Sequence, residues 1–260
     1  MKNAAFPTNT TDDQWKVIEP MLPPPAPTGR PRTPLRLVLD AILYVVKSGC
    51  QWNMLPKSFP PYKTVFHFFR AWVRGGILAD IHNRLRAHAR EREGRRSRPT
   101  AGIVDSQTVR SAGLAVESGY DAGKKTKGRK RFIMVDTLGH LIAVMVTPAD
   151  VQERQGGIEL LKGALPYHAW LRKIWVDGGY SGEDFANQVR EMRPKLDVEV
   201  VKRSDKAEGF EVLPRRWVVE RTFGWLMQCR RLVRDYERTV ESAVGWIHVA
   251  MIRIMLRRNP

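Results

Sequence analysis

The chain has 260 residues, of which 44 are Lys or Arg and 27 are Asp or Glu, so its formal charge is +17 at pH 7. This excess of bases excludes an ordinary neutral metabolic enzyme and favours a polyanionic partner, nucleic acid first and an anionic membrane second. With 43% hydrophobic residues the chain can bury a substantial core, which excludes a disordered protein. The apolar run Leu37–Val46 is too short to cross a bilayer, and no secretory signal is predicted. Because Cys50 and Cys229 are the only cysteines, we expect a protein of the reducing cytoplasm.

The first hundred residues predict short helices separated by prolines. Apolar residues at helical spacing indicate helices near residues 12–21, 35–48, 62–72 and 77–92. The helix over 62–72 combines aromatic residues with bases, a pattern typical of a helix-turn-helix-like DNA reader. We predict a helical DNA-binding domain over residues 1–98, with Lys63, His67 and Arg70 as DNA contacts. The alternative, in which the aromatics are core and the bases are simply solvated, stays open.

Two basic runs stand out in the rest of the charge pattern. Residues 84–98 include seven arginines, and residues 124–131 read Lys-Lys-Thr-Lys-Gly-Arg-Lys-Arg without an acid. An uncompensated cluster repels itself unless an anion binds it, so we expect both runs to contact the DNA backbone. The alternative is a solvated helix end for the first run and a loop for the second. The predicted contacts of the second run are Lys124, Lys125, Lys127, Arg129, Lys130 and Arg131.

From Thr100 onward the sequence predicts an α/β domain, which we assign to residues 99–260. Short β-branched runs indicate strands, the second and third of which are joined by a tight turn at 137–139. Strands and helices alternate after that hairpin, and two long helices close the chain. The expected strands cover residues 101–105, 131–136, 140–146, 173–177 and 197–202, and the expected helices cover 154–165, 182–192, 215–234 and 240–257.

Three acids occupy positions that suggest chemistry. Asp105 and Asp177 each end an apolar strand, where ligands bind in open α/β sheets. Glu220 lies in a helix that is otherwise basic and aromatic. Taken singly, each has a simpler interpretation, a cap or turn for each aspartate and a weak ion pair with Arg216 for the glutamate. Together, hard oxygen ligands in a basic protein suit two magnesium ions that clamp a phosphodiester. Asp136 is a rival third acid, although its position in the turn Asp-Thr-Leu-Gly explains it well.

These residues also carry a resemblance to a known family. The segments Ile-Val-Asp-Ser-Gln-Thr-Val, Val-Asp-Gly-Gly-Tyr and Trp-Val-Val-Glu-Arg-Thr-Phe-Gly-Trp-Leu resemble the three acidic blocks of bacterial DDE transposases, most of all the insertion-sequence-five family. The helical region from Trp15 to Trp72 resembles that family's N-terminal domain. The resemblance implies a mixed RNase H-like sheet flanked by helices, preceded by a small all-α domain.

The resemblance further implies that Asp105, Asp177 and Glu220 bind two Mg²⁺ ions, for which Mn²⁺ can substitute, and that Arg216 orients Glu220 or a phosphate. Met227 stands where the wider superfamily has a lysine, so Arg231, with Arg230 beside it, is expected to take over that phosphate contact. The implied partners are the terminal inverted repeats and target DNA, bound by a homodimer because two element ends must meet. No membrane partner is implied, and a nucleoid-associated cytoplasmic protein is expected. The alternatives are a non-catalytic DNA-binding regulator and a Mg²⁺-dependent nuclease without strand transfer.

Overall fold

A computed structural model describes residues 6–24, 28, 31–113, 115–201 and 216–258 of the chain. The chain divides into two compact units, the first formed by residues 1–89, 226–234 and 241–260 and the second by residues 90–225 and 235–240. This division differs from the sequence-based boundary at residue 98, which assigns the C-terminal helices to the second domain. No helix among the described residues is long and apolar enough to span a membrane.

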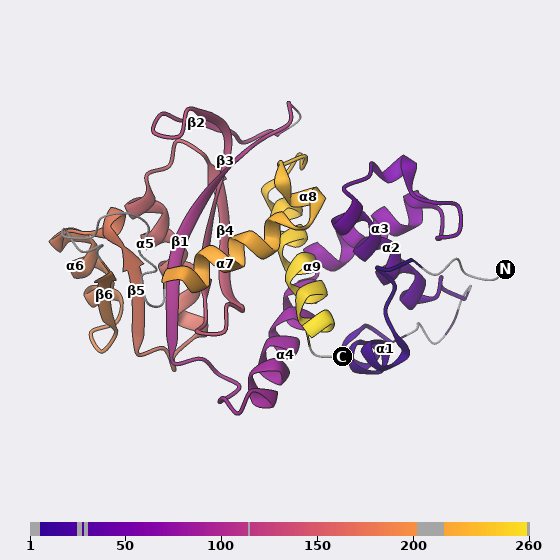
Figure 1. The fold of residues 1–260 in the computed structure, drawn as a ribbon, viewed down its shortest axis with the longest axis horizontal. Coiled ribbons are helices and arrows are strands. Elements are labelled where there is room, and N and C mark those ends of the chain that lie inside the picture. The colour runs from indigo at the N-terminus through magenta and orange to yellow at the C-terminus, as the bar shows by residue number, and fades with distance from the viewer. Residues whose placement is uncertain (1–5, 25–27, 29–30, 114, 202–215, 259–260) are drawn as a thin grey trace. The chain divides into compact units, whose positions relative to one another are not determined.

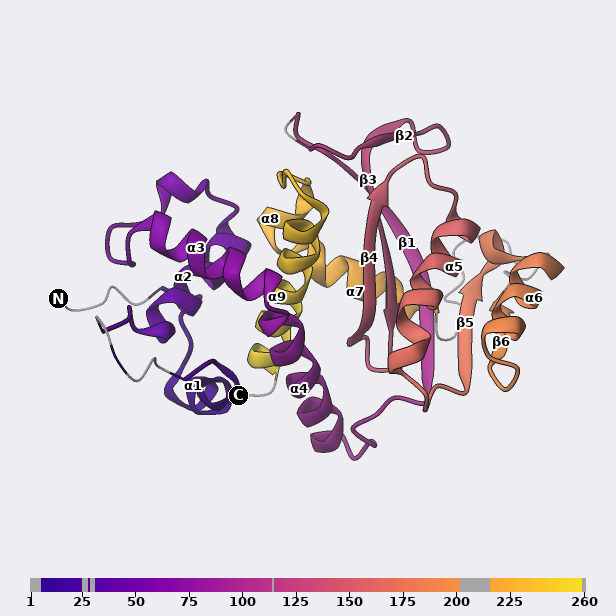
Figure 2. The same cartoon turned by 180° about the vertical axis from the view of Figure 1, so that it is seen from behind.

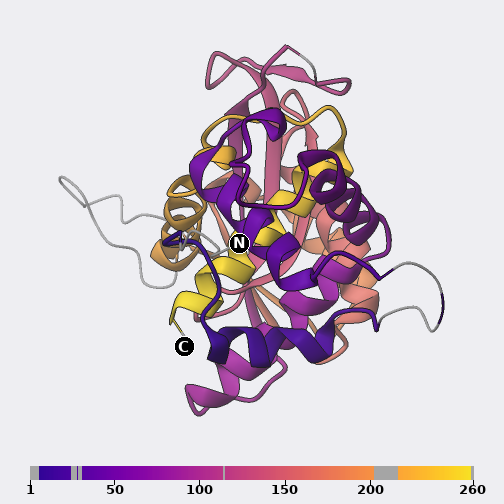
Figure 3. The same ribbon diagram turned by 90° about the vertical axis from the view of Figure 1, so that its right-hand side faces the viewer.

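The first unit is built from helices, and its C-terminal helix runs among its N-terminal ones (Figure 3). A capping box formed by Thr11 and Gln14 starts the first helix, and Gly49, with φ of +72°, ends the second. The elements are α1 (Asp12–Ile18), η1 (Glu19–Met21), α2 (Leu35–Ser48), η2 (Trp52–Met54), α3 (Tyr62–Arg74), α4 (Ile77–Arg92, to residue 89 in this unit), α8 (Arg230–Val233) and α9 (Val240–Arg258).

Helix α9 is central to the first unit because apolar residues occupy nearly its whole circumference. Trp246 is fully buried, and its ring centroid lies 4.3 Å from that of Phe69 and 5.5 Å from that of Trp52. The neighbouring Gly245 lets the helices approach closely, since a Cβ there would lie 2.4 Å from Val73. A helix of this kind requires partners on several sides, which explains why α9 belongs to the helical unit.

The second unit contains a six-stranded mixed sheet (Figure 1). Strand β3 pairs antiparallel with β1 on one side and with β4 on the other. Strand β5 is parallel to β1, and β6 is parallel to β5. The strand order along the sheet is β4-β3-β1-β5-β6, with the short β2 paired to β3. The strands are β1 (Ala101–Arg110), β2 (Gly119–Asp121), β3 (Thr126–Val135), β4 (Leu141–Pro148), β5 (Lys173–Asp177) and β6 (Asp197–Val201).

Helices cover the two faces of this sheet, as Figures 1 and 2 show from opposite sides. The helices of the unit are α5 (Glu153–Ala164), η3 (Leu165–Tyr167), η4 (Gly178–Tyr180), α6 (Glu183–Met192) and the first part of α7 (Arg216–Met227). Helix α5 packs closely on the sheet, because a Cβ on Gly156 would lie 2.0 Å from Phe132. Helix α7 crosses the opposite face, where Thr222 Oγ1 donates a hydrogen bond to the carbonyl of Gly139 at 2.9 Å. The mixed sheet flanked by helices confirms the predicted RNase H-like fold.

Several elements differ from the sequence-based expectations, and β1 continues to Arg110 rather than ending at the predicted residue 105. The expected helix over 215–234 is interrupted at residues 228–229, so that α7 and α8 are separate helices. The strand predicted to begin at residue 131 begins at Thr126 and continues to Val135, which excludes the alternative of a loop for most of the basic run 124–131. Strand β2 carries no apolar run and was not predicted, since its three residues are held by pairing with β3.

Candidate active site

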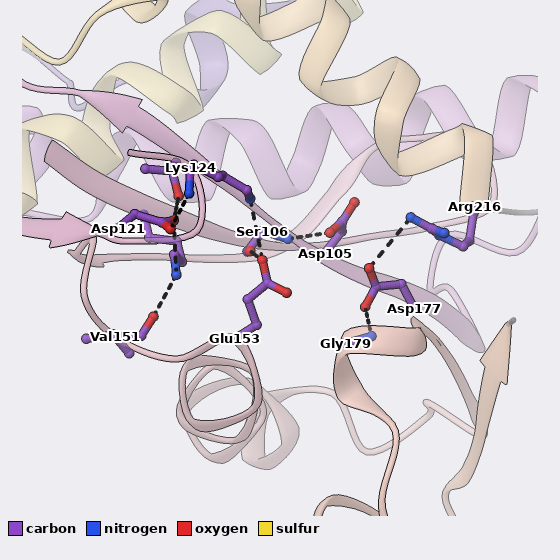
Figure 4. A network of polar contacts seen from close by, with 11 residues as sticks. Asp105, Ser106, Asp121, Lys124, Val151, Glu153, Asp177, Gly179 and Arg216 are labelled. Atoms are coloured by element: carbon purple, nitrogen blue, oxygen red, sulfur yellow. Dashed lines mark hydrogen bonds and ion pairs between the residues drawn. The ribbon is translucent and has the colours of Figure 1, made fainter. Parts of the chain in front are cut away.

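Asp105 and Asp177 lie side by side because their strands are parallel neighbours. The ladder between them ends with the pair Ile103 and Trp175, two residues before each aspartate, and the charge of Asp177 acts on Asp105. Asp177 ends β5, the usual position of a ligand site in an α/β sheet. Asp105 does not end its strand as expected, because β1 continues to Arg110 through its pairing with β3. The structure therefore brings together two of the three acids that the sequence predicts (Figure 4).

Backbone amides hold both carboxylates in place. The Ser106 N–H donates to Asp105 Oδ1 at 2.7 Å, and the Gly179 N–H donates to Asp177 Oδ1 at 2.9 Å. Burial raises the pKa of Asp105 to about 7, and the negative charges of Asp177 and Glu153 add to this rise, while the Ser106 amide and Arg216 oppose it. Asp105, Asp177 and Glu153 thus bring negative charge together at this site.

Arg216, at the start of α7, links Asp177 to the third predicted acid. Its Nη2 lies 3.7 Å from Asp177 Oδ2 and 3.4 Å from Glu220 Oε1. The Glu220 side chain remains 52% exposed. Glu220 is therefore on the correct face of α7, but a guanidinium, rather than a direct approach of the carboxylates, connects it with Asp177.

Glu153, in the first turn of α5, is a further acid at this site that the sequence analysis did not identify. Its Oε1 accepts a hydrogen bond from Ser106 Oγ at 3.1 Å and lies 3.5 Å from Lys124 Nζ. Figure 4 shows it beside Ser106, one residue beyond Asp105. A glutamate in the first turn of a helix is so common that its spacing in the sequence offers no signal.

The chemistry of these donors fits a divalent cation, since carboxylate oxygens are the ligands that Mg²⁺ prefers. The gap beside Gly179 also fits, because a Cβ there would lie 2.8 Å from Glu153 Oε2 and 3.0 Å from Asp177 Oδ1. Within the described residues, no three His, Cys, Asp or Glu side chains converge as a finished metal cage. The described carboxylates therefore lie near one another, but no three of them are close enough to bind one metal ion together.

Asp136, the rival third acid, has a structural role. It is fully buried, its Oδ2 lies 2.6 Å from Arg90 Nη1, and its Oδ1 accepts from the amides of Leu138 and His140. These bonds shape the turn between β3 and β4, as its sequence context indicates. They also explain Arg90, one of the seven arginines of the first basic run, which pairs inside the protein.

The predicted DNA contacts of α3 share one exposed side of that helix, whose opposite side is buried through Val65, Phe69 and Trp72. With neighbouring side chains they line a hollow of about 520 Å³. The residues that line it are Lys63, Phe66, His67, Arg70, Ala71 and Arg74.

The second basic run divides into exposed and buried residues, which corrects the expectation that all six contact DNA. Lys124, Lys125 and Lys127 are exposed. Arg129, Lys130 and Arg131 are buried, because β3 lies within the sheet. Arg129 Nη1 lies 3.3 Å from Asp235 Oδ2, and Lys130 Nζ donates to the carbonyl of Val151 at 2.8 Å.

The expectation for Arg231 also requires correction. Because the helix predicted over 215–234 breaks, Arg231 is in α8 rather than on the helix that carries Glu220. Its side chain is buried in the first unit, with the guanidinium 5.5 Å from the centroid of the Trp246 ring. Arg230 is exposed.

Comparison with known proteins identifies the family. Residues 96–255 match the family described as "Transposase DDE domain", and residues 10–82 match "Putative transposase of IS4/5 family". The chain belongs to the bacterial IS4/5 family of DDE transposases. DDE transposases are enzymes that act on DNA and generally use a divalent metal.

Three relatives illustrate this membership. A putative transposase for insertion sequence element IS402 of Burkholderia cepacia is 28% identical over 134 residues, covering 49% of this chain and 60% of the relative. An uncharacterized 16.2 kDa protein of the same element is 32% identical over 115 residues, covering 42% of this chain and 77% of the relative. The uncharacterized protein y4sN of Sinorhizobium fredii is 37% identical over 71 residues, covering 27% of this chain and 57% of the relative.

Proposed function

We propose that this chain binds the terminal inverted repeats of its insertion sequence and catalyses Mg²⁺-dependent DNA strand cleavage followed by strand transfer. The observation that supports this proposal is the presence of Asp105 and Asp177 on adjacent parallel strands, with Arg216 linking Asp177 to Glu220. Together with membership of the DDE family, this arrangement supports a role for these four side chains in the reaction.

The chain's own residues would hold the reacting groups in place. The amides of Ser106 and Gly179 fix Oδ1 of each aspartate, and Oδ2 of Asp177 lies 3.7 Å from Arg216 Nη2. A divalent cation held by Asp105, Asp177 and Glu220 would supply Lewis acidity toward a phosphodiester. Arg216 would then turn from its carboxylate partners toward a DNA phosphate, for which its planar guanidinium is well suited.

DNA recognition would be divided between the two units. The exposed side of α3, with Lys63, His67 and Arg70, would read a terminal repeat. Lys124, Lys125 and Lys127 would contact the backbone near the acids, and Arg230 is a further candidate. We expect a homodimer on DNA, because cleavage and joining at one pocket require two element ends to be brought together.

One assay distinguishes this function from the alternatives. Purified protein is incubated with Mg²⁺, labelled terminal-repeat DNA and a target plasmid. Joined products support the proposal, nicking alone would indicate a nuclease, and a mobility shift without nicking would indicate a regulator. Arg70→Ala should weaken repeat binding, whereas Lys57→Ala, which removes one charge from an exposed loop of the same unit, should not.

A further inference from the structure

We infer that Glu153 supplies a fourth carboxylate to the divalent-cation site of Asp105 and Asp177, an assignment that rests on the proposed metal-dependent function. Neither the sequence motifs nor the family match assigns a role to this residue. The argument depends on the position of Glu153, on the space around it and on a buried hydroxyl group aimed at the same place.

The position of Glu153 follows from the packing of α5 on the sheet. Its Oε1 is held by Ser106 Oγ at 3.1 Å, and the Ser106 amide in turn holds Asp105. Its Oε2 faces Asp177 Oδ1 across Gly179, with both oxygens within 3.0 Å of the point that a Cβ would occupy there. Gly179 therefore keeps open a gap bounded by two carboxylate oxygens, and Arg154 Nε fixes the backbone at this point by donating to the Gly179 carbonyl at 3.0 Å.

Tyr180 provides an independent observation. Its side chain is 1% exposed, and its hydroxyl makes no hydrogen bond of normal geometry with any described residue. The hydroxyl lies within range of the charges of Asp105, Glu153 and Asp177, with Ser106 also close by. A buried hydroxyl of this kind is destabilising unless a bound group completes its hydrogen bonds, so it points to a ligand among these three acids.

The charges around Glu153 agree with a cation site that ions can reach from solvent. Lys124 Nζ, 3.5 Å from Glu153 Oε1, provides part of the positive charge, as Arg216 does beside Asp177. A hollow of about 520 Å³, lined in part by Lys124, Glu153, Arg154 and Gly179, opens this place to solvent.

The test is direct Mn²⁺ binding to the full chain without DNA, measured by titration calorimetry, with circular dichroism to confirm folding. Glu153→Gln should weaken Mn²⁺ binding about tenfold or more, since even residues that only support ligands change metal affinity by 10 to 100-fold. Glu159→Gln, on the same helix and paired with Lys162 in solvent, is the matched control and should bind as the wild type does.

Two further variants distinguish a ligand from a residue that acts through Ser106. Gly179→Ala retains every carboxylate but fills the gap, and it should also weaken Mn²⁺ binding. Ser106→Ala should bind nearly as tightly as the wild type. If Glu153→Gln binds Mn²⁺ as tightly as the wild type does, Glu153 is not a ligand, although the proposed function can still hold. If Ser106→Ala loses as much Mn²⁺ affinity as Glu153→Gln does, Glu153 is a positioning residue and not a ligand. Absence of Mn²⁺ binding by the wild type would contradict the proposed function as well.

Discussion

Arg216 and Asp177 form an ion pair between α7 and the end of β5, with Nη2 and Oδ2 3.7 Å apart. The same nitrogen lies 3.4 Å from Glu220 Oε1 on the next turn of α7. One guanidinium thus joins two acids that are 43 positions apart in the sequence, and it balances part of the charge that the site concentrates. This pair defines how the third acid is held near the other two.

Replacing Arg216 should impair the reaction more than the fold. Arg216→Gln should slow strand cleavage about 100-fold, because small errors in the position of reacting groups are costly. Its free energy of unfolding should change by less than about 1 kcal/mol, since the pair is partly solvated. Cleavage kinetics and urea titration measure the two effects. Arg190→Gln, which removes a charge that bonds Asn187 on the surface of α6, should alter neither.

Lys127 and Arg129 of β3 should have different roles, the first in DNA binding and the second in stability. Lys127→Met should leave stability nearly unchanged but lower the salt dependence of DNA binding by about 0.9 in the log–log slope, because one phosphate contact is lost. Arg129→Met should cost about 3 to 5 kcal/mol, because it leaves Asp235 buried without its cation. Urea titration and salt-dependent binding measurements test both variants. A destabilised Lys127→Met protein or an unaffected Arg129→Met protein would refute this assignment.

Sequence patterns predicted most of the helices and strands, but they could not distinguish the bases that are exposed to DNA from those that are buried in the protein. The hydrophobic periodicity of α2 and the apolar runs that end in Asp105 and Asp177 depend on local spacing, which is visible in one dimension. Burial of Arg129 depends on the position of β3 inside the sheet, and the contribution of Glu153 depends on where α5 packs. Such long-range relationships have no local signature. The break between α7 and α8 was missed because apolar and basic residues continue through it.

Two glycines of α5 should respond oppositely to alanine. Gly156→Ala should destabilise the protein by about 1 to 3 kcal/mol, because the Cβ would lie 2.0 Å from the Phe132 ring. Gly163→Ala meets no atom within 4 Å and should stabilise it by up to about 1 kcal/mol through helix propensity. Thermal and urea unfolding measure both changes. Equal effects of the two substitutions would show that α5 does not pack on the sheet in this way.

His248 should make stability depend on pH in the acid range. Burial and the nearby charge of Arg86 lower its pKa from 6.5 to about 4. The unfolded chain therefore binds the proton more readily than the folded protein does. The contribution of neutral His248 to the free energy of unfolding is complete above pH 6.5 and is lost as the pH falls toward 4. The loss is at most about 3 kcal/mol. Urea midpoints measured from pH 4 to 7 should fall less steeply for His248→Gln than for the wild type. Parallel curves would contradict the shift.

Strand cleavage of labelled terminal-repeat DNA shows whether Asp105, Asp177 and Glu220 form the catalytic centre. Asp105→Asn, Asp177→Asn and Glu220→Gln keep the size of each side chain and remove its charge. Each should abolish cleavage in Mg²⁺ while the mobility shift of the same DNA remains at the wild-type protein concentration. Normal cleavage by any one of the three would exclude that residue from the site, and normal cleavage by all three would show that the catalytic centre lies elsewhere.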